Sequence, residues 1–185
     1  MQRQLNRRAF MLPVILAGFA RWGSRCVRAQ DKPETQPGTP ATPPPASPAA
    51  QGFSPVADQA LLAMARRAED LRIKGVAVVA HLEGDHVTAW SSKMVVVGSM
   101  TSAPSAKDHG SNLLAIAYSK AAEMADSLKD SGSAGRPPMT GEFGWAGGVI
   151  AKGKTGYLIA SFSGGPSEDD VRVSRAGLEV LTRLL

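Results

Sequence analysis

Hydrophobic residues recur at helical spacing in three parts of the chain. The first begins at Ser54-Pro55, a pair suited to a helix start, and ends at Gly75. Its apolar positions lie three or four residues apart and form one stripe: Ala57, Leu61, Met64, Ala68 and Leu71. This spacing predicts an amphipathic helix at the start of the folded region.

Two further helices are expected later in the chain. Residues 111–128 are rich in alanine and place apolar side chains on one side: Leu114, Ala117, Ala121, Met124 and Leu128. The last helix starts at Ser167, which we predict to be its N-cap, and runs to about Leu184. Asp170 can reach back toward this N-terminus, where carboxylates are favourable. Its inward positions are predicted to be Val173, Val180, Leu181 and Leu184.

Strands are predicted between these helices. The apolar run at 76–80 is typical of a buried strand, and Glu83-Gly84-Asp85 is typical of a tight turn. Segments 86–90 and 94–97 follow as a second and a third strand. Segments 145–151 and 155–163 form a hairpin across a short charged turn. The predicted order is therefore α-β-β-β-α-β-β-α, an α+β domain with an antiparallel sheet of about five strands flanked by helices.

The first 52 residues have a different pattern. Residues 2–9 are polar and positive, 10–20 are apolar, and small residues follow up to Ala29, which together predict an export signal peptide over 1–29. Arg7-Arg8 before Phe10 indicates the twin-arginine route. Residues 30–52, with seven prolines, are predicted to be a disordered linker. The domain would then span residues 53–185. The export signal predicts that the protein is periplasmic or extracellular.

Charge supports this division of the chain. The formal net charge is +5, but residues 1–30 hold six arginines and no acid, and the rest holds 15 basic and 16 acidic residues. A nearly neutral domain is not typical of a nucleic-acid-binding surface. No apolar run approaches the roughly 18 residues that a membrane-spanning helix needs. The single cysteine, Cys26, lies inside the predicted signal peptide.

The sequence contains no clear catalytic motif. Ser161-Phe162-Ser163-Gly164-Gly165 lacks the glycine spacing of a nucleophile elbow. The acidic run at 168–170 is explained by the helix N-terminus without a cation. The histidines His81, His86 and His109 are usually solvated residues at such positions, although each is also a possible haem ligand or proton carrier.

The last two-thirds of the chain carries an ordered set of motifs. They are Gly147-Gly148-Val149-Ile150, the segment Gly156 to Gly165, Ser167 to Asp170, Ala176-Gly177-Leu178 and Lys120-Ala121. From about Phe53 to Leu185 the chain resembles the GlcG/HbpS family of small haem-binding domains. The resemblance implies a profilin-like layered domain, a homo-oligomer, and binding of haem or a related tetrapyrrole. Some relatives degrade haem, and others are sensors beside a membrane kinase.

The first predicted hairpin, from residue 76 to about residue 97, differs from the family pattern. His81 stands where the family usually has aspartate, and Lys93-Met94 stands where it has a longer conserved segment. The resemblance implies that this region faces a ligand, so His81, Met94 and Lys93 are expected cofactor-binding residues. His109, in the loop before the alanine-rich helix, is a further candidate. His81 or His109 would be the axial ligand of the haem iron.

These observations give one leading hypothesis and two alternatives. The leading hypothesis is an exported haem-binding or haem-sensing domain that is not catalytic. Such a domain would form a homo-oligomer, and a membrane sensor kinase is a possible partner. The first alternative is an enzyme that degrades haem with an external reductant. The second alternative is a structural oligomer that has lost its ligand.

Overall fold

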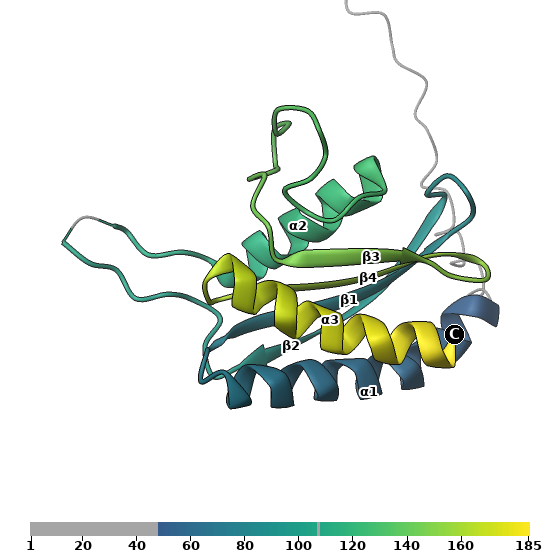
Figure 1. The fold of residues 1–185 in the computed structure, drawn as a ribbon, viewed down its shortest axis with the longest axis horizontal. Helices are drawn as coiled ribbons and strands as arrows, with labels where there is room; N and C mark the ends of the chain where they lie inside the picture. Colours follow the sequence, from purple (N-terminus) through teal and green to yellow (C-terminus); the bar gives the residue numbers. More distant parts are fainter. Residues whose placement is uncertain (1–47, 107) are drawn as a thin grey trace, which may run out of the picture. The chain divides into compact units, whose positions relative to one another are not determined.

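The computed structural model describes residues 48–106 and 108–185, with side chains from residue 52 onward. It is an α+β domain with three helices and four strands (Figure 1). In chain order the elements are α1 (Pro48–Asp70), β1 (Gly75–Glu83), β2 (Ala89–Val97), α2 (Leu113–Ser127), β3 (Gly148–Lys152), β4 (Gly156–Ser163) and α3 (Ser167–Leu184). The predicted signal peptide, and the predicted linker up to residue 47, lie outside the described residues.

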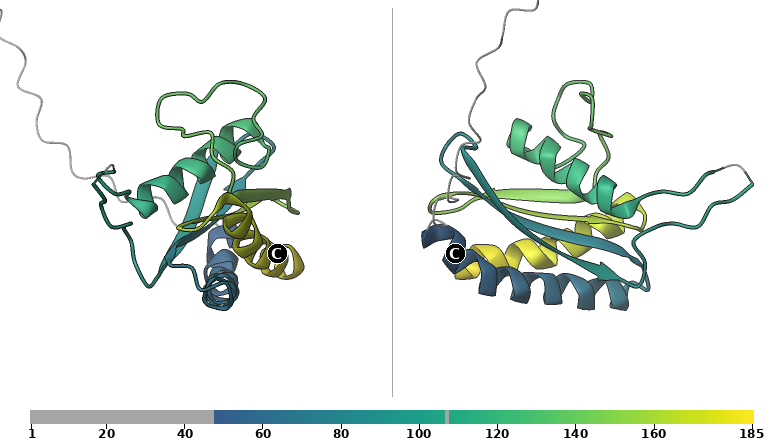
Figure 2. Two further views of the ribbon diagram at one scale, coloured as in Figure 1. Left: turned by 60° about the vertical axis from the view of Figure 1, so that its left-hand side comes forward. Right: turned by 180° about the vertical axis from the view of Figure 1, so that it is seen from behind.

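The four strands form one antiparallel sheet in the order β2-β1-β4-β3. Helices α1 and α3 pack together against one face of the sheet, and α2 covers the other (Figures 1 and 2). None of the described helices has the length and apolar character needed to cross a membrane. The layered α+β class predicted from the sequence is confirmed.

The central strand β1 is buried on both faces, as its continuous apolar run predicts. Ala77 and Val79 face α1 and α3 and join the larger core cluster. The alternate positions Val76 and Val78 face α2, because successive side chains of a strand point to opposite faces. The same alternation decides where every candidate residue on β1 and β2 lies.

The prediction of five strands is wrong, because the two segments expected at 86–90 and 94–97 are one strand. β2 pairs with β1 without interruption from Ala89 opposite Glu83 to Val97 opposite Gly75. The polar residues between the two segments do not break the strand. The Ser92 hydroxyl lies 3.4 Å from the Tyr118 hydroxyl on one face, and Lys93 pairs with Asp58 on the other. Residues 86–88 belong to the turn instead.

The helix termini also differ from their predicted positions. α1 begins at Pro48 rather than at Ser54, and Pro55 lies inside it. Continuing the helix before Pro55 buries Phe53, which is 2% exposed in the core. α3 begins at Ser167, but its N-cap is Pro166, and no side chain caps the helix. Leu184, predicted to face inward, is exposed in the last turn.

Candidate functional site

His81 lies on the face of β1 that packs against α1 and α3. Its side chain is buried, its ring centroid is 6.1 Å from that of Phe53, and its Nε2 lies 3.0 Å from the Thr155 hydroxyl oxygen. Its Nδ1 is buried and has no hydrogen-bond partner among the described residues. A haem ligand needs an open coordination side. The surroundings of His81 therefore do not fit this role.

The other three predicted site residues lie in different places. His109 is exposed on the long connection between β2 and α2. Met94 faces α2, where it packs beside the cluster around Val78. Lys93 faces the opposite side of the sheet, and its ammonium is 2.8 Å from both carboxylate oxygens of Asp58. The structure therefore does not bring the four residues together.

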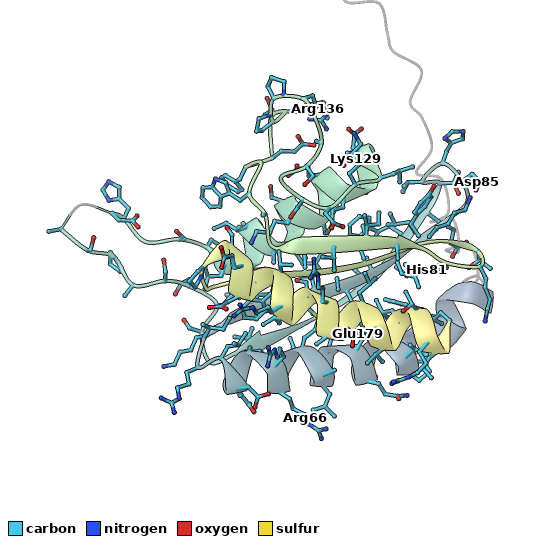
Figure 3. The ribbon with its side chains drawn as sticks, in the orientation of Figure 1. Arg66, His81, Asp85, Lys129, Arg136 and Glu179 are labelled. Carbon is cyan, nitrogen blue, oxygen red and sulfur yellow. The ribbon has the colours of Figure 1, made fainter. Side chains whose placement is uncertain are left out.

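The third histidine, His86, lines the largest of the described concavities. This groove of about 460 Å³ lies between the β1–β2 turn and the C-terminal half of α2. Its lining residues are mostly apolar: His86, Val87, Trp90, Ala122, Ala125, Asp126 and Leu128. In Figure 3, Asp85 marks the turn and Lys129 the end of α2. We call this concavity the His86 groove.

The composition of the His86 groove suits an organic ligand. Val87, Trp90 and Leu128 are each more than one-third exposed, although large apolar side chains usually lie inside a domain. His86 is also exposed, so its imidazole is accessible as a nitrogen ligand. Pockets for small molecules usually combine apolar walls with few polar groups and have volumes of 300–1,000 Å³. The apolar lining and the accessible imidazole are therefore compatible with an apolar organic group that carries a metal ion.

A buried ion pair lies at the N-terminus of α3. The Lys120 ammonium is 2.8 Å from Oδ2 of Asp170, and both side chains are 4% exposed. Lys120 also donates to the Phe162 carbonyl, and Oδ1 of Asp170 accepts from the backbone N–H of Gly165. Burial raises the pKa of Asp170, and the nearby Lys120 ammonium opposes this shift. The pair ties α2 to β4 and α3.

The Lys120–Asp170 pair lies at a second, smaller concavity of about 200 Å³. Trp145 and Ser111 are among its other lining residues. Because both charges are saturated by each other and by backbone groups, the pair has a structural role here. Ser161, in the neighbouring strand, uses its hydroxyl to donate to the Ala117 carbonyl and is no free nucleophile.

A long loop, residues 128–147, covers the outer side of α2. Arg136 holds this loop by donating to both carboxylate oxygens of Glu142, at 2.7 and 2.9 Å, and to Asp126 on α2. Bidentate pairs of this kind are stronger than single contacts. They lower the pKa of Glu142 to about 2, mainly through the hydrogen bonds from Arg136. The loop also carries the exposed, stacked rings of Phe143 and Trp145.

This arrangement predicts the titration of Glu142. In the wild type its carboxyl should titrate near pH 2, and in Arg136→Gln the pKa should rise toward the ordinary value of about 4.3. Because the pKa is lowered in the folded loop, the stabilisation from this contact is complete only above the unfolded pKa of about 4.3, and it is lost as pH falls toward 2. Side-chain carboxyl NMR over pH 1.5–6 measures both values. An unchanged pKa in the variant would contradict the assignment.

Comparisons with known proteins add no further constraint. No protein-family model matches this chain, and no curated protein matches its sequence. Within residues 48–106 and 108–185, no group of three or more His, Cys, Asp or Glu side chains could hold a metal ion. The function must therefore be inferred from the grooves and the individual side chains of this chain.

α2 carries two buried charged residues, of which the sequence patterns name Lys120 only as part of a family motif and Glu123 not at all. Both are buried, at 3% and 2% exposure. A signal was present, because Lys120 is four residues after Ile116 and four before Met124, which are both buried on this helix. A charged residue inside an apolar stripe indicates a buried partner or a site. No local pattern marks His86 as a groove residue, since its position there depends on which turn faces α2.

Proposed function

We propose that this domain binds haem or a related tetrapyrrole in the His86 groove without converting it chemically. One observation carries the proposal: an exposed imidazole beside an open groove of about 460 Å³ with mostly apolar walls. The resemblance of residues 53–185 to the GlcG/HbpS family supports the ligand class. The proposal replaces His81 and His109 by His86 as the expected axial ligand.

Each part of the groove has a separate task in this proposal. A ring nitrogen of His86 would bind the iron that haem carries. Trp90 and Leu128 would contact the flat ring and remove apolar surface from water. Binding in an exported protein, as the N-terminal pattern predicts, would suit haem capture or sensing outside the cytoplasm.

Titration of haemin into the domain, followed by its Soret band, tests the proposal. A saturable shift is expected in the wild type, and His86→Ala should weaken binding at least tenfold, because one metal–nitrogen bond is lost. His109→Ala is the matched control, since His109 is also exposed but lines none of the described concavities. Haemin should also quench Trp90 fluorescence, and Trp90→Phe should remove most of this quenching.

Three outcomes would overturn the proposal. No saturable Soret shift would exclude haem binding, and equal effects of His86→Ala and His109→Ala would exclude the groove. Loss of the Soret band with iron release, under ascorbate and catalase, would indicate a haem-degrading enzyme instead of a binding domain. Catalase is needed because hydrogen peroxide alone bleaches haem.

A further inference from the structure

Glu123 is a buried carboxylate that the proposed function does not use. It lies on α2 with 2% exposure. Its Oε1 accepts from the backbone N–H of Gly132 at 2.8 Å. Its Oε2 is buried and has no hydrogen-bond partner among the described residues. An unpaired buried carboxylate oxygen costs free energy, so this atom requires an explanation.

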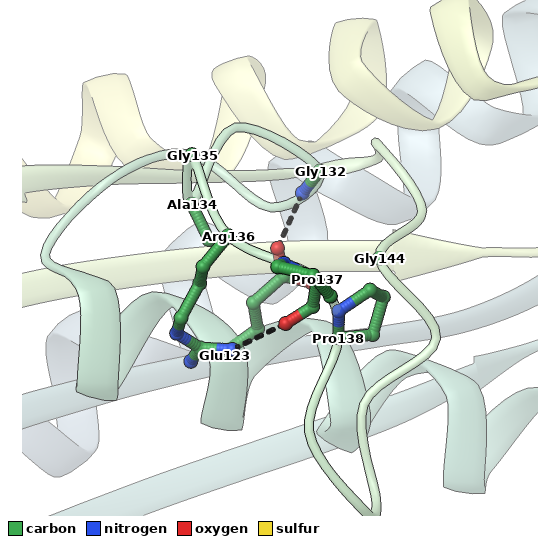
Figure 4. A pocket seen from close by; sticks show the side chains of 8 residues that line it. All are labelled: Glu123, Gly132, Ala134, Gly135, Arg136, Pro137, Pro138 and Gly144. Carbon is green, nitrogen blue, oxygen red and sulfur yellow. Dashed lines mark hydrogen bonds between the residues drawn. The ribbon is translucent and has the colours of Figure 1, made fainter.

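A pocket lies between Glu123 of α2 and the 128–147 loop. Its volume is about 350 Å³, and it is lined by Glu123, Gly132, Ala134, Gly135, Arg136, Pro137, Pro138 and Gly144 (Figure 4). The two prolines supply apolar wall, and the glycines leave space because they have no side chains. A space of this size holds about ten water molecules or a small organic group.

The charges around this pocket favour a cation. Arg136, the basic residue in its lining, is already bound by Glu142 and Asp126. The Lys129 ammonium lies near Gly135 at the edge of the pocket, 3.6 Å from where a Cβ on that glycine would be. Among the residues that line the pocket, Glu123 is therefore the ionisable side chain without a partner of opposite charge. A ligand that donates hydrogen bonds and carries positive charge would supply this partner.

We propose that this pocket binds the primary ammonium group of a small organic molecule, with Glu123 as its anionic partner. An ammonium group offers three donors and matches the acceptor-only carboxylate. A bare metal ion is a poorer match, since no cluster of three or more His, Cys, Asp or Glu ligands occurs in the described parts of the chain. Pro137 and Pro138 would contact the carbon chain next to the ammonium group.

Amide NMR with three probes of equal size tests this proposal. The probes are n-propylammonium chloride, n-propanol and sodium propionate, and magnesium chloride serves as a metal probe. Propylammonium alone should cause saturable shifts of the Gly132 and Gly135 amides, which line the pocket. Glu123→Gln keeps the acceptor for Gly132 but removes the charge, and should weaken binding at least tenfold.

Glu179→Gln is the matched control, because it removes the same charge from an exposed position on α3 (Figure 3). It should leave propylammonium binding within twofold of the wild type. The proposal is overturned if no probe gives a saturable shift, if propanol or magnesium binds equally well, or if both Gln variants have the same effect. The wild-type probe series decides the question even if Glu123→Gln does not fold.

Discussion

Replacing Lys120 with methionine is expected to lower the free energy of unfolding by about 3–5 kcal/mol at pH 7.5. The substitution removes one partner of a buried pair whose side chains are both 4% exposed. Asp170 would keep its bond from Gly165 but lose its counter-charge. Urea unfolding, followed by circular dichroism, measures the change. Since small domains have only 5–15 kcal/mol of stability, the effect is large.

The expected loss depends on pH in a defined direction. Burial already raises the pKa of Asp170, and Lys120 opposes that shift, so the pKa should rise further in Lys120→Met. A raised carboxyl pKa means that the folded state holds a proton at a pH where the unfolded chain has released it. Stability therefore falls as pH rises through that window. The difference between wild type and variant should narrow at pH 5, because a protonated Asp170 carries no unpaired charge.

Lys152→Met provides the control for this prediction. Lys152 pairs with Asp85 at 3.1 Å, but both side chains are more than 60% exposed. Exposed pairs contribute 0–1 kcal/mol, so this variant should change the unfolding free energy by less than about 1 kcal/mol. Equal losses in the two lysine variants would show that the buried pair has no special structural role. Asp170→Asn is the reciprocal probe: its amide oxygen can still accept from Gly165, but the buried Lys120 ammonium loses its counter-charge.

Much of this fold follows from local patterns in the sequence. The stripe that includes Met64 and Ala68 predicts α1, and the run from Val76 to Ala80 predicts β1, because burial of these faces dominates their energetics. The apolar pattern predicts two strands in place of β2, because Ser92 and Lys93 are polar. The hydroxyl and carboxylate partners of these two side chains come from distant parts of the chain, and no local pattern contains them.

The candidate sites were less accessible to sequence reasoning than the helices. The alternation of β1 places His81 on the same face as Ala77 and Val79, and this pattern could have predicted its burial. In contrast, the His86 groove forms only when the β1–β2 turn meets α2, which is a tertiary property. The contact of Glu123 with Gly132 depends likewise on the path of a long loop. A site built from two separate elements is visible only after the fold is known.

Replacing Gly156 with alanine should be among the most damaging single-methyl changes in the domain. Gly156 opens β4 with φ of +153°, a backbone conformation that side chains disfavour. An added Cβ would collide with the Leu82 carbonyl oxygen, and it would lie 3.0 Å from the backbone nitrogen of Gly84. These obstacles are backbone atoms of β1 and its turn, so no side-chain rotation relieves the collision. The backbones of β1 and β4 must move apart locally instead.

The expected cost of Gly156→Ala is about 3–5 kcal/mol, the sum of backbone strain and overpacking. Gly141→Ala separates the two contributions, because Gly141 also has a positive φ, +94°, but an added Cβ there meets nothing within 4 Å. That control should lose only about 1 kcal/mol, the price of the strained backbone alone. Urea midpoints of the two variants, measured side by side, give the difference. Equal midpoints would mean that β1 and β4 can adjust to the methyl group. The close backbone approach of these two central strands would then add no cost, contrary to this prediction.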